Sequence, residues 1–127
     1  MGKKILILDD EPDMQGLVER VLGQKGLVVK KAGHPREAIE MVACEEFGLL
    51  IVDFKLPGID GLEFMRRIKK EGFDNKWMVI TGRPTSLLED QARAEGCAAF
   101  LVKPLDIHEF ESEVERILNS KDGGGGM

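Results

Sequence analysis

The chain alternates between short apolar runs and longer segments in which apolar residues recur at helical spacing. The apolar runs cover residues 5–8, 27–29, 49–52, 77–80 and 98–102. Between the first two runs, Met14, Leu17 and Val18 follow the i, i+3, i+4 spacing of an amphipathic helix. Further helices are expected from Pro35 and over about 62–71, 85–95 and 107–118. Five strands that alternate with five helices predict an α/β domain, with a parallel sheet between two layers of helices.

One apolar run ends abruptly in a carboxylate, and the prediction of function starts from it. Residues 49–52 have the pattern of a strand buried on both faces, and Asp53 follows them directly. Three other runs also stop at polar residues, which are Asp9-Asp10, Thr81 and Lys103. Because the carboxyl ends of parallel strands meet along one edge of a sheet, where ligands bind, these side chains are expected to lie close together.

The residue types at this edge favour phosphoryl transfer. Three carboxylates repel one another, and burial would push at least one of them to bind a proton. A divalent cation relieves this repulsion, and a few hard oxygen ligands suit Mg²⁺ that keeps several of its waters. With the ammonium of Lys103 and the hydroxyl of Thr81 beside it, Asp53 is interpreted as a nucleophile toward phosphorus. Plainer explanations stay open, since the acidic pair could cap a helix and Lys103 could merely precede a turn.

Length and charge limit the number of domains and the kinds of binding partner that the chain can have. The 127 residues suffice for one domain, predicted at 3–119, before a Gly-rich tail at 120–127 that we interpret as a linker or a cloning remnant. With 18 basic and 23 acidic residues, the net charge of -5 argues against nucleic acid or an anionic membrane as the direct partner. The cysteines are isolated, and no apolar run approaches the roughly 20 residues of a membrane span. A cytoplasmic protein with reduced thiols and no zinc site is expected.

In their order and spacing, these motifs resemble the receiver domain of two-component response regulators. The resemblance covers about 3–119. It rests on the pair Asp9-Asp10, on Asp53 with the stretch LPGIDG at 56–61, on Thr81, and on Lys103-Pro104. It implies a flavodoxin-like fold with strand order 2-1-3-4-5 and a cis peptide between Lys103 and Pro104.

The resemblance also implies the acceptor and the metal ligands. Asp53 would take a phosphoryl group from a phosphohistidine of a sensor histidine kinase or a phosphotransfer protein. The cofactor Mg²⁺ would be bound by Asp10, by Asp53 and by the backbone carbonyl of Lys55. Asp9 would act mainly through a metal-bound water. Such a protein is not an enzyme, but a phosphoacceptor that assists its own phosphorylation and dephosphorylation.

A switch and an output surface follow from the same resemblance. Lys103 would pair with the phosphoryl oxygens, and Thr81 would move to bond one of them. Phe100 lies where the family places a switch aromatic, although a plain core residue is an equally good interpretation. The face of the fourth helix, the fifth strand and the fifth helix would contact a downstream effector domain or protein, or a second copy in a homodimer.

Two positions carry residues that differ from the common choices in the family. Lys55 and Arg83, which follow Asp53 and Thr81 by two residues, flank the path of an attacking water and are expected to modulate the phosphoryl lifetime.

Two other functions compete with this interpretation. One is a receiver fold used as an unphosphorylated docking module. The other is a haloacid-dehalogenase-like phosphatase, which would want an Asp at position 55 and an acidic pair late in the chain.

Overall fold

A computed structural model describes residues 3–120, and five strands alternate with five helices within them, as predicted. The strands are β1 (Lys4–Leu8), β2 (Val28–Ala32), β3 (Leu49–Asp53), β4 (Trp77–Thr81) and β5 (Ala99–Val102). The helices are α1 (Pro12–Gly23), α2 (Pro35–Cys44), α3 (Gly61–Lys70), α4 (Ser86–Ala94) and α5 (Ile107–Asn119). The predicted elements therefore differ from the observed ones only at their ends.

The strands form one parallel sheet in the order β2-β1-β3-β4-β5, which confirms the predicted flavodoxin-like fold. All five residues of β3 are buried, whereas β2 lies at an edge and is largely exposed. In the register of the sheet, Leu8 pairs with Val52 and Asp53 pairs with Ile80. The chain therefore leaves β1 and β3 side by side, and β4 ends one residue further on beside them.

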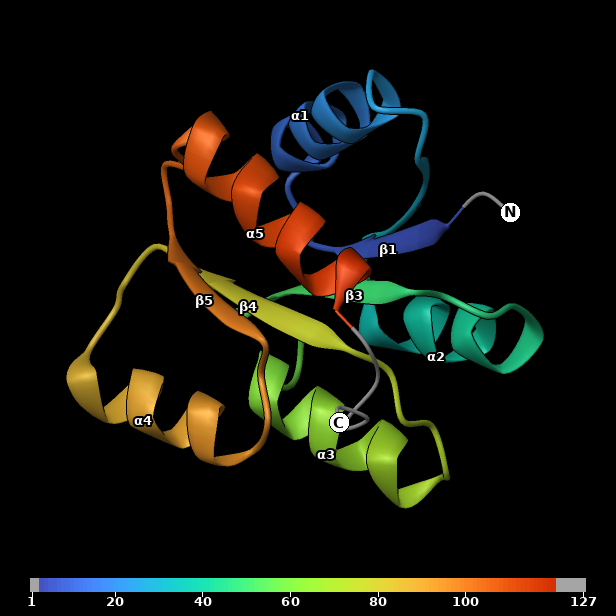
Figure 1. Ribbon diagram of the computed structural model, residues 1–127. Coiled ribbons are helices and arrows are strands. Elements are labelled where there is room, and N and C mark those ends of the chain that lie inside the picture. Colours follow the sequence, from blue (N-terminus) through green and yellow to red (C-terminus); the bar gives the residue numbers. More distant parts are fainter. Residues whose placement is uncertain (1–2, 121–127) are drawn as a thin grey trace.

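Helices cover both faces of the sheet and divide its core into two parts (Figure 1). The helices α1 and α5 lie on one face, where Ile51 and Ile80 belong to one apolar cluster. The helices α2, α3 and α4 lie on the other face, where Val52 and Val79 belong to a second cluster. Because both faces of the central strands are buried, their sequences are continuous apolar runs rather than alternating ones.

Side-chain caps fix the starts of the helices that follow β3 and β4. Asp60 accepts a hydrogen bond from the amide of Glu63 at 2.8 Å, and Glu63 accepts one from the amide of Asp60 at 3.0 Å. This capping box satisfies amides that the first turn of α3 leaves unpaired. The hydroxyl of Thr85 accepts from the amide of Leu88 at 3.0 Å, so α4 begins just after Thr85 rather than at it.

The helix α4 is attached mainly at its carboxyl end. Two of its residues are buried, while Leu87 in its first turn is 66% exposed. At the other end, the ammonium of Lys69 on α3 donates to the carbonyl oxygen of Glu95 at 2.6 Å. Arg66, also on α3, donates from Nε to the carboxylate of Glu95 at 2.9 Å. The carboxyl end of α4 is therefore bonded to α3, while its amino end is held by the Thr85 cap and by the burial of Leu88.

Four smaller expectations concern the tail, membrane-spanning helices, the two cysteines and the peptide bond before Pro104. Most of the predicted Gly-rich tail, residues 121–127, lies outside the described residues. Within residues 3–120, no helix has both the length and the apolar character needed to cross a membrane. The thiols of Cys44, which is exposed, and Cys97, which is buried, are both free. The peptide bond between Lys103 and Pro104 is cis, as the resemblance implied.

Candidate functional site

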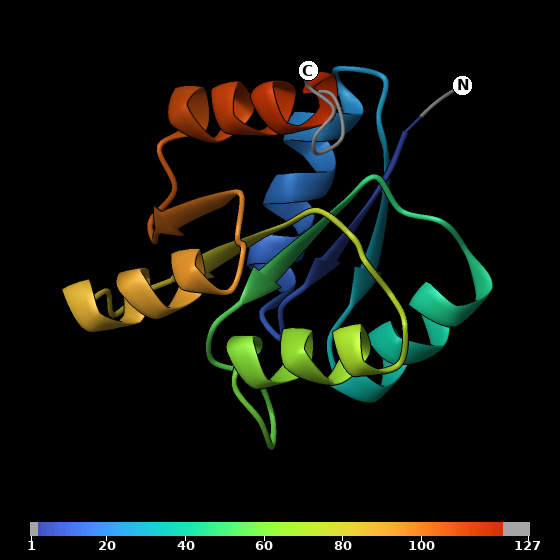
Figure 2. The ribbon, with the colours of Figure 1, turned by 60° about the horizontal axis from the view of Figure 1, so that its bottom comes forward.

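The polar residues at the strand ends converge at one end of the sheet. The five strands point in the same general direction, and the loops after β1, β3, β4 and β5 emerge together (Figure 2). Ligand oxygens of Asp9, Asp10 and Asp53 all lie within 4.8 Å of one another. The predicted acidic cluster is therefore present in the folded chain.

Asp53 lies at the carboxyl end of β3, a strand whose five residues are all buried, and is itself only 5% exposed. Its Oδ1 accepts a hydrogen bond from the amide of Lys55 at 3.3 Å. Its Oδ2 accepts one from the ammonium of Lys103 at 3.2 Å. The next residue, Phe54, continues the pairing with β4 by donating its amide to the carbonyl of Ile80 at 2.9 Å. The backbone thus remains hydrogen-bonded directly after Asp53.

Asp9 is fully buried and is held through its backbone as well as its side chain. Its Oδ1 accepts from the amide of Glu11 at 2.8 Å, and its amide donates to the carbonyl of Ala32 at 3.0 Å. The side-chain amide of Gln15 on α1 donates to its carbonyl oxygen at 2.7 Å. Among the described residues, the buried Oδ2 of Asp9 accepts no well-aligned hydrogen bond, and its close partner is the ammonium of Lys103 at 3.1 Å. A buried acceptor of this kind has a free energy cost that a ligand could relieve.

Lys103 links the carboxylates of this end of the sheet. In the described part of the chain, its Nζ lies 2.7 Å from Oε1 of Glu11, 3.1 Å from Oδ2 of Asp9 and 3.2 Å from Oδ2 of Asp53. Burial acts to lower the pKa of Lys103, but its contacts with Glu11, Asp9 and Asp53 outweigh burial and raise the pKa. Lys103 is therefore a fixed cation at neutral pH.

The pKa values of both buried carboxyl groups are raised. Burial is the largest cause for Asp9 and for Asp53, because it disfavours the charged form. The charge of Asp53 raises the pKa of Asp9 further, and the charge of Asp10 raises that of Asp53. Hydrogen bonds and the charge of Lys103 act in the opposite direction without cancelling these causes. Protons are therefore held more tightly by these two carboxyl groups than by exposed ones.

The residues present fit a hard divalent cation such as Mg²⁺. Asp9 and Asp53 are buried and Asp10 is exposed, so a cation in contact with all three carboxylates would keep a side open to water. The burial of Asp9 and the raised pKa values are the features that such a cation would relieve. Carboxylate oxygens are the ligands that Mg²⁺ prefers in proteins, together with water.

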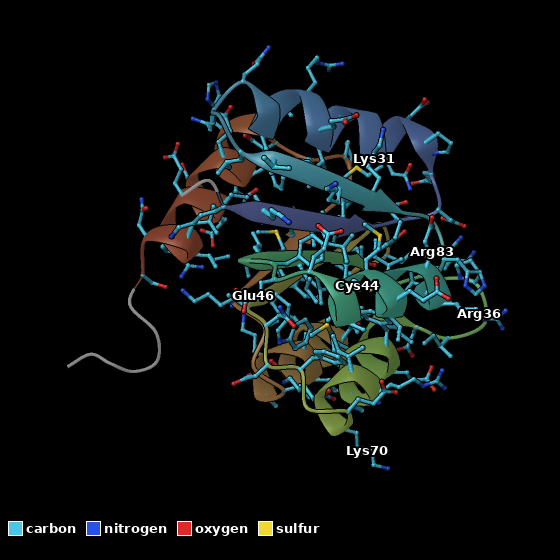
Figure 3. All side chains as sticks on the ribbon, turned by 90° about the vertical axis from the view of Figure 1, so that its right-hand side faces the viewer. Lys31, Arg36, Cys44, Glu46, Lys70 and Arg83 are labelled. Atoms are coloured by element: carbon cyan, nitrogen blue, oxygen red, sulfur yellow. The ribbon has the colours of Figure 1, made fainter. Side chains whose placement is uncertain are left out.

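Thr81, Lys55 and Arg83 surround the open side of Asp53. They line, together with Asp10, Asp53 and Lys103, an open hollow of about 670 Å³. Thr81 is buried, and its hydroxyl accepts a hydrogen bond from the amide of Arg83 at 3.1 Å. Lys55 and Arg83 are both exposed. Figure 3 places Arg83 at the end of the molecule toward which the strands point.

Phe100 does not line the hollow around Asp53 and belongs to the apolar core. It is 9% exposed and belongs to the same apolar cluster as Leu88 and Ala92 of α4. The structure therefore brings together every predicted polar site residue and places the predicted switch aromatic beneath α4. The structure adds Glu11 and Gln15, for which no role in the site was predicted, to these residues. The signal for Glu11 was its position directly after the acidic pair, whereas nothing in the sequence pointed to Gln15.

The chain matches one protein family over most of its length. Residues 5–115 match the family described as the response regulator receiver domain. The chain is 28% identical to the sporulation initiation phosphotransferase F of Bacillus subtilis, over 95% of this chain and 98% of that protein. It is 32% identical to the response regulator receiver protein CpdR of Brucella abortus, over 91% of this chain and 97% of that protein. It is also 32% identical to the response regulator protein PilR of Pseudomonas aeruginosa, but spans only 27% of that protein.

Solved structures agree with this match. A CheY-like response regulator receiver domain protein from Methanospirillum hungatei superposes with a TM-score of 0.89, at 24% identity, over 98% of this chain and all of that one. The beryllofluoride-activated NtrC4 receiver domain dimer superposes with a TM-score of 0.85, at 26% identity, over 91% of this chain and 95% of that one. Sequence, fold and site geometry lead to one conclusion: this chain belongs to the receiver domain family of two-component response regulators.

Proposed function

We propose that this chain is a phosphorylation-controlled switch in which Asp53 accepts a phosphoryl group. The observation that carries the proposal is the surroundings of Asp53. One oxygen contacts the ammonium of Lys103, and the carboxylate lies beside Asp9 and Asp10 at the edge of an open hollow. An acceptor with a fixed cation and an acidic metal site beside it suits in-line attack on phosphorus.

The proposed donor is a phosphohistidine of a sensor kinase or a phosphotransfer protein. A carboxylate oxygen of Asp53 attacks phosphorus, the P–N bond breaks, and its electron pair stays on the imidazole. Bound Mg²⁺ would supply positive charge to the phosphoryl oxygens. Asp10, Asp53 and the carbonyl of Lys55 would hold that ion, with Asp9 acting through a water. The protein then assists its own phosphorylation and dephosphorylation and does not turn over a separate substrate.

The switch would begin at Thr81. Its hydroxyl accepts from the amide of Arg83, so a turn toward a phosphoryl oxygen would break that contact and displace the loop before α4. The amino end of α4 would then move with this loop. The two buried residues of α4, Leu88 and Ala92, pack in the same cluster as Phe100, so Phe100 would repack when the helix moves. A segment with two alternative conformations can in this way convert the added charge of a phosphoryl group into a change in the shape of the protein surface.

The proposed output surface consists of α4, β5 and α5. It carries Leu87 and Val102, which are 66% and 43% exposed, and exposed large apolar side chains favour contact with another protein. The occupant would be an effector domain or protein, or a second copy of the chain. The NtrC4 receiver domain, whose activated form is described as a dimer, supports the homodimer by analogy.

The exposed cations Lys55 and Arg83 are proposed to set the lifetime of the phosphoryl group. Both side chains line the hollow next to Asp53. A long cationic side chain there can contact phosphoryl oxygens or obstruct a water that would attack phosphorus. We further propose that the functional unit is the 3–119 domain.

Intact mass spectrometry after incubation with acetyl phosphate tests the proposal. A gain of one phosphoryl group is expected with Mg²⁺, and none without it or in Asp53→Asn. As a matched control, Asp74→Asn removes an exposed carboxylate from the opposite end of the sheet and should leave the gain intact. No gain in the unchanged protein under any condition would refute phosphorylation and favour the unphosphorylated docking module.

A further inference from the structure

Glu11 makes the shortest contact of Lys103, and it is the most exposed partner of that ammonium. The distance is 2.7 Å to Glu11, against 3.1 Å to Asp9 and 3.2 Å to Asp53. The side chain of Glu11 is 62% exposed, whereas those of Asp9 and Asp53 are 0% and 7% exposed. Lys103 is thus attached to two buried acids and to one acid that water can reach.

An ammonium has three N–H donors, and among the described residues three carboxylates surround this one. A phosphoryl group on Asp53 would add strong acceptor oxygens beside Lys103. Phosphorylation also converts the charged carboxylate of Asp53 into a neutral acyl group, which weakens its own contact with Lys103. When Lys103 turns toward a phosphoryl oxygen, its remaining contacts with Asp9 and Glu11 oppose that movement. Losing Lys103 would leave Asp9 buried and less compensated, whereas water can replace Lys103 at Glu11 at a small cost in free energy.

We propose that Glu11 is a positioning residue that holds the ammonium of Lys103 in the unphosphorylated protein and gives it up when Asp53 is phosphorylated. This inference rests on the function proposed above and concerns how readily that reaction occurs. The contact between Glu11 and Lys103 must break before the transition state is reached. Glu11 therefore slows phosphorylation and stabilises the unphosphorylated form. It acts through Lys103 and does not touch the reacting atoms.

The reaction used for the test is phosphoryl transfer from acetyl phosphate. A carboxylate oxygen of Asp53 forms a bond to phosphorus, the bond from phosphorus to the acetyl oxygen breaks, and acetate leaves with the electron pair. The rate is measured by intact mass at saturating Mg²⁺, with the Mg²⁺ affinity of each variant determined separately. In Glu11→Gln, a rate about fivefold higher is expected, which corresponds to the upper range for one partly exposed ion pair.

Asp13→Asn is the matched control. It removes one negative charge from the first turn of the same helix, and no ion pair joins Asp13 to Lys103 in the described part of the chain. Its rate should equal that of the unchanged protein. If Asp13→Asn accelerates the reaction as much as Glu11→Gln does, a general field effect explains the result and the proposed contact does not.

A second measurement needs neither metal nor reaction. In metal-free protein labelled with ¹⁵N-lysine, the ammonium signal of Lys103 should exchange with water faster in Glu11→Gln and stay unchanged in Asp13→Asn. Equal exchange and equal rates in Glu11→Gln and the unchanged protein would overturn the inference alone. No phosphoryl uptake by the unchanged protein would overturn the proposed function, and this inference with it.

Discussion

Gly61 lies against the backbone of Asp53 so closely that a side chain has no room between them. A Cβ atom at Gly61 would stand 2.7 Å from the carbonyl oxygen of Asp53 and 3.1 Å from the Cα of Phe54. The amide of Gly61 also donates to the carbonyl of Phe54 at 2.7 Å. The start of α3 is thus packed directly against the peptide that presents the acceptor.

Gly61→Ala should therefore displace the acceptor strand and destabilise the fold by about 1–3 kcal/mol, as other cases of overpacking do. Urea unfolding would measure the loss of stability, and the acetyl phosphate reaction would show slower uptake at Asp53. The opposite result is expected for Gly16→Ala in the interior of α1, where an added Cβ meets nothing within 4 Å. That change should stabilise by up to about 1 kcal/mol. A Gly61→Ala protein as stable as the unchanged one would refute the steric argument.

The two exposed cations of the hollow provide a prediction about lifetime. Lys55→Ala and Arg83→Ala should each shorten the half-life of phosphorylated Asp53 by about twofold to fivefold, the range for one exposed charge contact. Loss of the phosphoryl mass after removal of acetyl phosphate measures the half-life. Arg36→Ala is a suitable control, because Arg36 is another exposed arginine and lines a different hollow (Figure 3). If neither lifetime changes relative to this control, the modulating role of Lys55 and Arg83 is wrong.

The raised pKa of Asp53 predicts how stability depends on pH in the absence of metal. A carboxyl group whose pKa is higher in the folded than in the unfolded protein destabilises the fold while it is charged. This destabilisation is fully present above the raised pKa and disappears as the pH falls from there toward the ordinary value of the carboxyl group. Asp53→Asn should therefore raise the melting temperature at a pH above the raised pKa.

Two comparisons in the same melting experiments test this explanation. The difference between Asp53→Asn and the unchanged protein should shrink as the pH is lowered through the raised pKa of Asp53. Added Mg²⁺ should stabilise the unchanged protein more than the variant, because a ligand of the metal is lost. A variant that melts lower than the unchanged protein at every pH would show that the contact with Lys103 outweighs burial.

Metal affinity should depend on pH for the same reason. Bound Mg²⁺ requires charged carboxylates, so protons compete with it, and this competition begins at a higher pH when the pKa values of Asp9 and Asp53 are raised. Calorimetric titration with Mg²⁺ between about pH 8 and pH 5 should show affinity that falls steadily toward acid. Calcium-free buffers and the Asp10→Asn variant, which removes one ligand, serve as comparisons. An affinity independent of pH over this range would contradict the raised pKa values of Asp9 and Asp53.

Much of this arrangement could be predicted from the sequence because it depends on where strands end. The apolar runs determine β1, β3, β4 and β5, and parallel topology then brings Asp9, Asp53, Thr81 and Lys103 to one edge. The cap at Asp60 was predictable as well, because a capping box is a local pattern.

The remaining contacts could not be predicted, because they depend on the direction of side chains from separate segments. Nothing in the pattern of α1 indicates that Gln15 donates to the carbonyl of Asp9 or that Glu11 reaches across to Lys103. The close approach of Gly61 to Asp53 likewise depends on the path of the loop between β3 and α3. These contacts hold the predicted site in its geometry.

The division of the core by the sheet has a mechanical consequence. Phe100 and the buried residues of α4 belong to one compartment, while α5 packs in the other, behind a continuous wall of paired strands. A repacking around Phe100 would stay within its own compartment and leave α5 in place. The proposed movement of α4 would then change its position relative to α5. A partner that contacts both helices would bind the two arrangements with different affinity.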